Sequence, residues 1–436
     1  MQSPSIPRAR RPPASLAARF GISRIDDQGR HTPWHVLRGN PRFRLYFIGS
    51  VTSDFGTWLQ NTAQVVLAYQ LAHSVLAVGL VTFAQFTSPL LLGPWAGVAA
   101  DKFGGRRTLL GTQVISAVTA ATLAGLEFGG LLNVWFLVTG AIVTGLAFTF
   151  ALPARNVTVQ RLVPPEKLKP AFAMDSVSYN LGRAVAPLFT MVLALTGVTF
   201  AWAFAANAVS FVVFGAILWR SRMGAAEPLQ RSRVRDGFLI AIKDHRILIL
   251  LLMVAAVTVA DDPILVLGPA IARHLHASAA SSGWFIAALG GGTVLGSFRR
   301  SKHRPTLRLA ATALAALALF MVLFTHAPTM WFAALAALGA GASCLIANSV
   351  TRAVLAELAG PRKSAAVMAV WAIAWAGSKP FAALLDGALG SWIGPQWTGV
   401  ILAGPALVPI TVIVLLLARD LVRQSFRSIR QVGVEG

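Results

Sequence analysis

The sequence predicts an all-α polytopic membrane protein with twelve transmembrane helices. Of its 436 residues, 56% are hydrophobic and only 12% are charged, whereas soluble domains carry about 25% charged residues. Apolar runs of about 20 residues, each long enough to cross a bilayer, recur along nearly the whole chain. Basic residues gather in every second gap between these runs, a pattern typical of cytoplasmic loops.

The apolar runs define the positions of the expected spans. Helices are favoured over barrel strands because lipid leaves no partner for open backbone groups and the runs lack the alternation of barrel strands. We place the spans at residues 44–71, 75–100, 108–128, 132–153, 171–196, 198–219, 246–273, 281–298, 307–325, 329–352, 364–391 and 396–418.

The charge distribution fixes the expected orientation and excludes a nucleic-acid partner. The net charge is +22, from 38 Lys and Arg against 16 Asp and Glu. A nucleic-acid binder concentrates such charge on one patch, but here it alternates with the apolar runs. Both termini are therefore expected to be cytoplasmic, which requires an even number of spans.

Five regions are expected along the chain. The long basic gap in the middle separates two halves of six helices, which open alike with Asn40-Pro41-Arg42 and Asp244-His245-Arg246. Two six-helix halves related by a pseudo-two-fold axis form a known transporter design. The regions are a disordered basic cytoplasmic tail (1–40), an N-terminal bundle (41–219), a cytoplasmic linker (220–243), a C-terminal bundle (244–419) and a cytoplasmic tail (420–436).

No catalytic, metal or cofactor site is expected. Cys344 is the only cysteine, which excludes an internal disulfide and a cysteine metal site. The chain lacks a His-Glu-x-x-His helix, a phosphate-binding loop and the Gly-x-Gly-Asp segment of intramembrane aspartyl proteases. We therefore expect a protein that is not an enzyme.

A short motif at the end of the second expected span carries a family resemblance. The chain reads Gly-Val-Ala-Ala-Asp-Lys-Phe-Gly-Gly-Arg-Arg from Gly97. This segment resembles the cytoplasmic loop motif of the major facilitator superfamily, and the resemblance implies that the loop latches the two halves together in one state. The matching residues are Gly97, Asp101, Lys102, Gly104, Arg106 and Arg107.

A second stretch, in the fifth expected span, narrows the resemblance. It is similar to the Asn-x-x-Arg-x-x-Gly-Pro pattern of bacterial exporters like the enterobactin exporter, which is related to a motif associated with antiporters. Ala186 replaces the usual glycine, and the fourth span lacks the Arg near its start that proton-coupled drug exporters often carry. The residues concerned are Asn180, Gly182, Arg183, Ala186 and Pro187.

The resemblance implies a function and a set of partners. We expect a monomer in the bacterial inner membrane that exports a small organic compound, such as a siderophore or a drug-like amphiphile, by alternating access. Protons, or another coupling ion, would move by antiport. An importer of a small nutrient is the alternative, and a receptor or an intramembrane enzyme is a remote one.

Ionisable residues inside the spans are candidates for the transport pathway, because a charge in the bilayer is costly unless it pairs or faces water. At about 1.5 Å per residue, the candidates lie roughly 15 to 24 Å from the cytoplasmic ends of their helices. Crowded carboxylates such as Asp261 and Asp262 suit a proton carrier, and Pro263 should kink their helix. The ionisable candidates are Asp54, Asp261, Asp262, Arg183 and Lys379, and the neutral Asn61 joins them because it lies on the same polar face as Asp54.

Each candidate has a structural alternative. The polar stripe of the first span from Ser50 to Gln64, which includes Asp54 and Asn61, faces either a water-filled pathway or a network among helices. Arg183 forms either a functional contact or a packing salt bridge. Lys379, in a Gly-Ser-Lys-Pro segment that signals a broken helix, pairs with an intramembrane Asp or contacts an anionic group of the substrate.

Two further expectations concern residues outside this set. Asp386 lies near the outer end of its span, where we expect it to be exposed at the membrane interface. Four tryptophans could line a hydrophobic cavity, but for each one we expect a lipid-facing or interfacial position. They are Trp58, Trp284, Trp371 and Trp375.

Overall fold

The computed structural model describes residues 33–221, 234–300 and 306–412, and the described residues form helices joined by short connections. Its N-terminal part contains α2 (Pro33–Gly39), α3 (Pro41–Ala72), α4 (Val75–Phe103), α5 (Gly105–Phe128), α6 (Val134–Leu162), η1 (Pro165–Lys167), α7 (Leu168–Leu195) and α8 (Ala201–Arg220). Its C-terminal part contains α9 (Val234–Lys243), α10 (His245–Asp261), α11 (Pro263–Val266), α12 (Gly268–His274), η2 (Ala279–Ser282), α13 (Gly283–Arg300), α14 (Leu307–Thr325), α15 (Met330–Trp392), α16 (Pro395–Ala403) and η3 (Gly404–Ala406).

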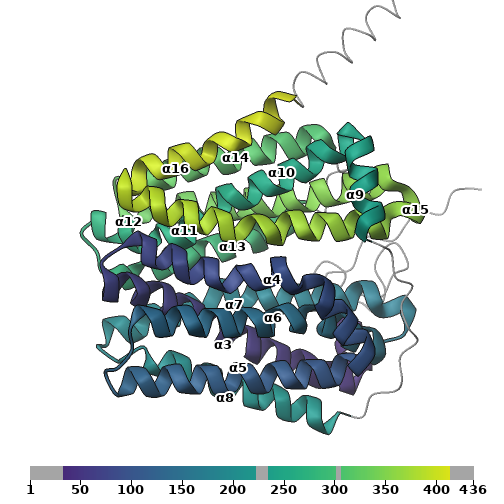
Figure 1. The fold of residues 1–436 in the computed structure, drawn as a ribbon, viewed down its shortest axis with the longest axis horizontal. Helices are drawn as coiled ribbons and strands as arrows, with labels where there is room; N and C mark the ends of the chain where they lie inside the picture. Colours follow the sequence, from purple (N-terminus) through teal and green to yellow (C-terminus); the bar gives the residue numbers. More distant parts are fainter. Residues whose placement is uncertain (1–32, 222–233, 301–305, 413–436) are drawn as a thin grey trace, which may run out of the picture.

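The long helices run side by side in two groups (Figure 1). Helices α3 to α8 pack on one another and form one group, and α9 to α16 form the other. The groups meet chiefly through two helix pairs, α4 with α15 and α7 with α13. We call these groups the N-terminal and C-terminal halves.

Within the described part of the chain, eight helices are long and apolar enough to cross a membrane: Val75–Gly93, Gly105–Phe128, Val134–Leu162, Ala201–Arg220, His245–Val266, Leu307–Thr325, Met330–Gly360 and Ala366–Trp392. Each coincides with one of the twelve expected spans. Helical segments also occupy the other four expected positions, in α3, α7, α13 and α16. Helix α3 is not among these eight helices because its polar stripe makes it less apolar. The total of twelve spans and the pseudo-two-fold relation remain predictions.

Helix boundaries differ from expectation at two places. The helix that was expected to end at 153 continues through Pro153 to Leu162. The expected tail contains the helix α2, with Val36 and Leu37 buried, so the prediction of disorder is wrong for 33–39. Residues 1–32, half of the linker and the C-terminal tail lie outside the described residues.

The expected seventh span is broken twice by prolines. Helix α10 ends at Asp261, α11 begins at Pro263, and a second break before Pro269 starts α12. Proline removes a backbone donor and interrupts a helix in this way, so the predicted kink is confirmed. No such break occurs at Pro380, where α15 continues to Trp392, and the predicted broken helix is wrong there.

Helix α15 joins two expected spans across a sharp bend. Gly360 has φ 66° and ψ 168°, a conformation outside the helical region. A glycine adopts it at little cost because it has no Cβ. The bend therefore separates Met330–Gly360 from Ala366–Trp392.

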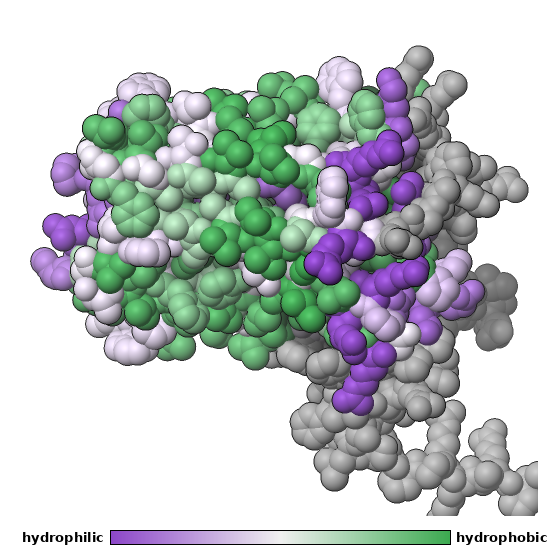
Figure 2. All heavy atoms as spheres, turned by 90° about the horizontal axis from the view of Figure 1, so that it is seen from below, coloured by the Kyte–Doolittle hydropathy of each residue, from purple (hydrophilic) through white to green (hydrophobic). Residues whose placement is uncertain are grey.

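The surface is divided along the helix direction. Figure 2 shows a broad hydrophobic belt in the middle and hydrophilic side chains gathered at the right-hand end. That end carries α9 and the bend of α15 (Figure 1). We call it the basic end, and the opposite end, near α12, the outer end.

Candidate functional site

A cavity of about 750 Å³ lies between the two halves. Helices α3, α4, α6 and α7 line one side, and α10, α13 and α15 line the other. Its wall extends from Asp261, Asp262 and Lys379 to Gln160 and Arg352, which lie near the basic end. A site shared between halves can change its access when the halves move against each other.

The cavity is closed at the outer end by helix contacts. A Cβ at Gly79 of α4 would lie 2.5 Å from the carbonyl oxygen of Ala383 and 2.9 Å from the Cα of Gly387, both in α15. Ser391 Oγ accepts a hydrogen bond of 2.9 Å from the backbone N–H of Leu76. Only glycine permits such close approach of two backbones, so α4 and α15 form a tight seal here.

Towards the basic end the same helix pair separates. Gly93 and Gly97 of α4 have no atom within 4 Å of an added Cβ. Helices α4 and α15 therefore diverge from the seal at Gly79, and the cavity wall reaches Phe172 and Met368. The cavity thus opens at the basic end.

Arg183 forms an ion pair that crosses between the halves. Its Nη2 donates to Asp261 Oδ2 at 3.1 Å, with α7 on one side and α10 on the other. The guanidinium also lies 5.5 Å from the ring centre of Trp58. Asp261 Oδ1 has no hydrogen-bond partner. A single strong contact therefore joins these helices across the cavity.

Lys379 pairs with Asp262, one of the two alternatives predicted for it. Lys379 Nζ lies 3.5 Å from Asp262 Oδ1 and 4.8 Å from the ring centre of Phe86 in α4. The lysine therefore contacts an acid of its own half and an aromatic ring of the other half. Asp261 and Asp262 both line the cavity.

The antiporter-like motif of α7 lies at the interface of the halves. Asn180 Oδ1 accepts a hydrogen bond of 3.1 Å from Thr293 of α13. A Cβ at Gly182 would lie 2.9 Å from the backbone of Asp54, so this glycine lets α7 pack closely on α3. Ala186 is fully buried, and the carbonyl oxygen of Pro187 would lie 2.7 Å from a Cβ at Gly283. The motif thus serves helix packing as well as the ion pair of Arg183.

Aromatic side chains line much of the cavity. Trp371 and Trp375 stack with parallel rings 6.3 Å apart, and the Arg352 guanidinium lies 5.0 Å from the Trp371 ring centre. Trp58 also lines the cavity. The expectation of a lipid-facing position is therefore wrong for these three tryptophans. Trp284 is 40% exposed beside Trp331 on the outside of α13, and this agrees with the expected lipid-facing position.

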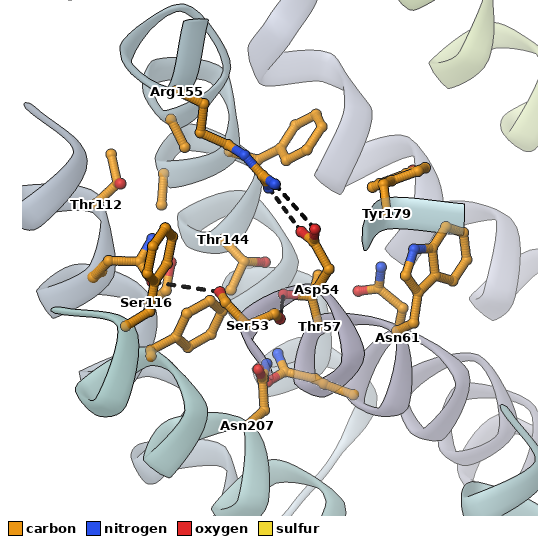
Figure 3. A pocket seen from close by; sticks show the side chains of 18 of the residues that line it. Ser53, Asp54, Thr57, Asn61, Thr112, Ser116, Thr144, Arg155, Tyr179 and Asn207 are labelled. Carbon is orange, nitrogen blue, oxygen red and sulfur yellow. Dashed lines mark hydrogen bonds and ion pairs between the residues drawn. The ribbon is translucent and has the colours of Figure 1, made fainter. Parts of the chain in front are cut away.

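A second charged cluster lies within the N-terminal half (Figure 3). Arg155 Nη1 lies 2.7 Å from Asp54 Oδ1, and Nη2 lies 3.0 Å from Asp54 Oδ2 and 2.9 Å from Asp175 Oδ1. Ser178 donates to Asp54 Oδ2 at 2.5 Å, and Ser50 contacts Arg155 Nη2. We call this set the α3–α6–α7 cluster.

The α3–α6–α7 cluster divides the predicted polar stripe. Asp54 is buried beside a small cavity of about 80 Å³ within the N-terminal half, and it does not line the large cavity. Asn61 and Gln64 do line it, and Asn61 accepts a hydrogen bond of 3.2 Å from Gln85. One part of the stripe therefore belongs to a network among helices and another part faces the cavity; a role of the second part in a transport pathway remains a prediction.

The sequence did not identify Arg155 and Asp175 as partners of Asp54. The expected span ends at 153, which would place Arg155 in the loop that follows. The signal that could have found it is the need of a buried carboxylate for a cation on a neighbouring helix. Asp175 follows closely in the next helix.

The loop motif lies between α4 and α5 at the basic end. Gly104 has φ 83°, which favours glycine at this turn. The side chain of Arg106 donates to the carbonyl of Leu218 at 2.8 Å, and it also contacts the carbonyl of Trp219. Arg106 thus joins α5 to α8 within the N-terminal half. Asp101, Lys102 and Arg107 are exposed.

Asp386 differs from its expected position. It is fully buried, at 0% exposure, in the outer part of α15. Neither carboxylate oxygen has a hydrogen-bond partner. The expectation of an exposed interfacial residue is therefore wrong, because the seal between α4 and α15 covers this part of the helix.

Among the described residues, no group of three or more His, Cys, Asp or Glu side chains could hold a metal ion. Cys344 is a buried free thiol in the cavity wall. Asn348 Oδ1 and Trp371 Nε1 belong to cavity-lining residues, and both atoms are buried without a hydrogen-bond partner. The site therefore offers ion pairs and aromatic rings to an organic molecule.

Solved transporters share this arrangement. The structure superposes on the nucleoside transporter NupG with a TM-score of 0.68 and 13% identity, over 86% of this chain and 99% of that one. The POT family transporter PepTSo gives 0.66 and 14% identity, over 87% and 98%. At such identities the likeness shows the fold alone.

Sequence relatives are efflux proteins. The enterobactin exporter of Shigella flexneri is 26% identical over 276 residues, covering 61% of this chain and 64% of the relative. Macrolide efflux protein A of Streptococcus pyogenes is 23% identical over 161 residues, covering 36% and 40%. The chain thus matches between two fifths and two thirds of the length of these relatives.

A family match extends much further along the chain. The sequence pattern of the transmembrane secretion effectors, which are transporters of the major facilitator superfamily, matches residues 31–425. This range includes both halves and the whole cavity wall. The chain therefore belongs to the transmembrane secretion effector family of the major facilitator superfamily.

Proposed function

We propose that the protein exports a small organic compound, of the siderophore or drug-like amphiphile type, by proton-driven alternating access. The observation that carries this proposal is the cavity between the halves, which holds two ion pairs and is sealed at the outer end. The efflux functions named for the relatives support the direction of transport.

The chemistry of the wall favours an amphiphilic substrate. Stacked Trp371 and Trp375 offer flat apolar surfaces, and pockets for organic molecules combine such surfaces with a few polar groups. Arg352 has no acidic partner among the described residues, since its contact is with the Trp371 ring. An aromatic substrate with an anionic group would match both features.

The state of the cavity supports uptake from the cytoplasm. The basic end is the cytoplasmic one by the distribution of Lys and Arg, and the cavity opens there. A substrate would enter from the cytoplasm, and rocking of the halves would then break the seal at Gly79 and close the basic end. The loop motif between α4 and α5 lies at the basic end and would hold the halves together once that end has closed.

The inter-half ion pair provides a means of coupling to protons. Protonation of Asp261 would remove the charge that attracts Arg183, whose other contacts are with aromatic groups. The attraction between α7 and α10 would fall, and the halves could change position. Each inward proton would thereby be linked to one change of access.

The proposal is tested by accumulation measurements in efflux-deficient cells. Cells expressing the chain would be loaded with labelled siderophores or amphipathic dyes, with and without a protonophore. We expect lower accumulation that the protonophore reverses, and no such effect in cells expressing Lys379→Met. The matched control is Lys243→Met, which changes an exposed lysine at the basic end.

Two outcomes would contradict the proposal. Higher accumulation that is abolished by the protonophore would indicate an importer instead. Export that is insensitive to the protonophore would support the proposed direction of transport. It would contradict the proposal that protons are the coupling ion.

A further inference from the structure

Asp386 is the one intramembrane aspartate of the described helices without a basic partner. Asp54, Asp175, Asp261 and Asp262 each lie within 3.5 Å of an Arg or Lys nitrogen. Asp386 is fully buried and makes neither an ion pair nor a hydrogen bond within the described part of the chain. The surroundings thus provide nothing to stabilise a negative charge.

Burial of this kind favours the neutral acid. An ionised carboxylate without a donor or cation loses its hydration and gains nothing in return, and such a group takes up a proton instead. The neighbours strengthen this preference, because the carboxylate of Asp262 acts on Asp386 as a like charge. The facing stretch of α4, residues 75–86, and α16 contain no ionisable side chain, and α10 contributes only Asp261 and Asp262 here.

The position of Asp386 separates it from the cavity. It follows Lys379 by seven residues, two helical turns on the same face and about 10 Å along the helix. It does not line the cavity, whereas Lys379 and Asp262 do. Its neighbour Gly387 lies against Gly79 in the seal. Asp386 therefore lies on the outer side of the closed end of the cavity.

We propose that Asp386 is a proton-binding site, occupied in this state, that supplies the proton moved inwards by the transporter. When the seal between α4 and α15 opens, the carboxyl meets the outer medium and binds a proton. The proton then leaves Asp386 for the carboxylate of Asp262, which lines the cavity, and this step ends the proton-occupied state: Asp262 becomes neutral as Asp386 becomes ionised. Lys379 stays cationic; it lies 3.5 Å from Asp262 and two turns from Asp386 on α15, so it attracts the ionised Asp386 once Asp262 is neutral.

This role rests on the proposed proton-driven export, but the proton on Asp386 can be tested without any substrate. Infrared spectra of the purified full chain in lipid at neutral pH would show the C=O stretch of a protonated carboxyl. We expect Asp386→Asn to remove that band. Asp244→Asn is the control, because Asp244 caps α10 through its carboxylate and asparagine caps equally well. An unchanged band in Asp386→Asn would overturn the proposed site.

A second measurement tests the role in transport. Accumulation of labelled enterobactin and of a labelled macrolide would be compared in cells expressing the wild type, Asp386→Asn and Asp386→Glu. We expect at least a tenfold loss of protonophore-sensitive export in the Asn variant and substantial recovery in the Glu variant, which keeps a proton-binding group. Wild-type export by Asp386→Asn would overturn the role.

The two measurements separate the two proposals. A carboxyl band assigned to Asp386 together with export that ignores the protonophore would retain the site and refute proton-driven export. Protonophore-sensitive export without such a band would refute the site and retain the function. Size-exclusion elution of each variant shows whether it folds, and asparagine closely matches the shape of the neutral acid.

Discussion

The two charged regions of the protein differ in how completely their groups are paired. In the α3–α6–α7 cluster, Arg155 binds Asp54 through both guanidinium nitrogens and also binds Asp175. At the interface of the halves, Arg183 makes one bond to Asp261, and Asp261 Oδ1 has no partner. The first region lies within one half, whereas the second joins the halves.

This difference suggests different tasks. A network with several bonds per charged group holds its helices in one arrangement, so the α3–α6–α7 cluster suits a half that moves as a rigid body. A single bond across an interface can be exchanged for other contacts when the halves move. Transport function is therefore expected to depend on the interface pairs, and stability on the cluster.

The largest expected effect on the folded state comes from Arg155→Ala. The change leaves Asp54 and Asp175 buried or half-buried without their cation, and breaking a buried ion pair in this way costs about 3–5 kcal/mol. We expect a clear fall in the thermal unfolding temperature of the purified protein, with low expression. Arg246→Ala, at an exposed position, is the control. If the Arg155 variant kept the stability of the wild type but could not transport, the α3–α6–α7 cluster would serve transport and not stability.

The largest expected effect on transport comes from Lys379→Met. Methionine keeps the length of the side chain but removes the charge that lies 3.5 Å from Asp262. Export should be abolished, and the unfolding temperature should fall less than in Arg155→Ala, because one ion pair is lost instead of two. A fully active variant would show that the pair is dispensable.

A comparison of two acids separates the regions more finely. Asp261→Asn removes the charge that holds Arg183 across the interface, so export against a gradient should fall at least tenfold with little change in stability. Asp54→Asn should instead lower the unfolding temperature, because Arg155 loses its bidentate partner. The measurements are export and thermal unfolding of each variant. If both variants lost coupling and neither lost stability, Asp54 would be a proton carrier as the sequence predicts.

The sequence predicted the positions of the long helices and several of the intramembrane charges, but it did not identify Arg155 or Asp175 and did not place Asp386 in a buried position. Apolar runs and prolines predicted the break at Pro263, since both are local properties. The pairing of Arg155 with Asp54 joins residues 101 positions apart, and the burial of Asp386 follows from the contact of α15 with α4. Such facts depend on tertiary packing, which the periodicity of one helix does not contain.

The tryptophans show the same limit, and they lead to the smallest expected effect. An apolar ring is compatible with lipid or with a cavity, so the sequence alone could not place Trp371 and Trp375 in the cavity wall. Stacked aromatic contacts contribute about 0.5–1.5 kcal/mol beyond buried area. Trp371→Ala should therefore raise the KM for an aromatic substrate by up to about tenfold, with kcat little changed.

Trp284→Ala is the matched control for that prediction, because its ring lies on the outside of α13 beside Trp331. Concentration-dependent export in vesicles would give KM for both variants. The decisive comparison is between an aromatic and an aliphatic substrate of similar size and charge. If Trp371→Ala weakened both equally, the change would reflect a general widening of the cavity, and the stacked pair would lose its role in selecting flat molecules.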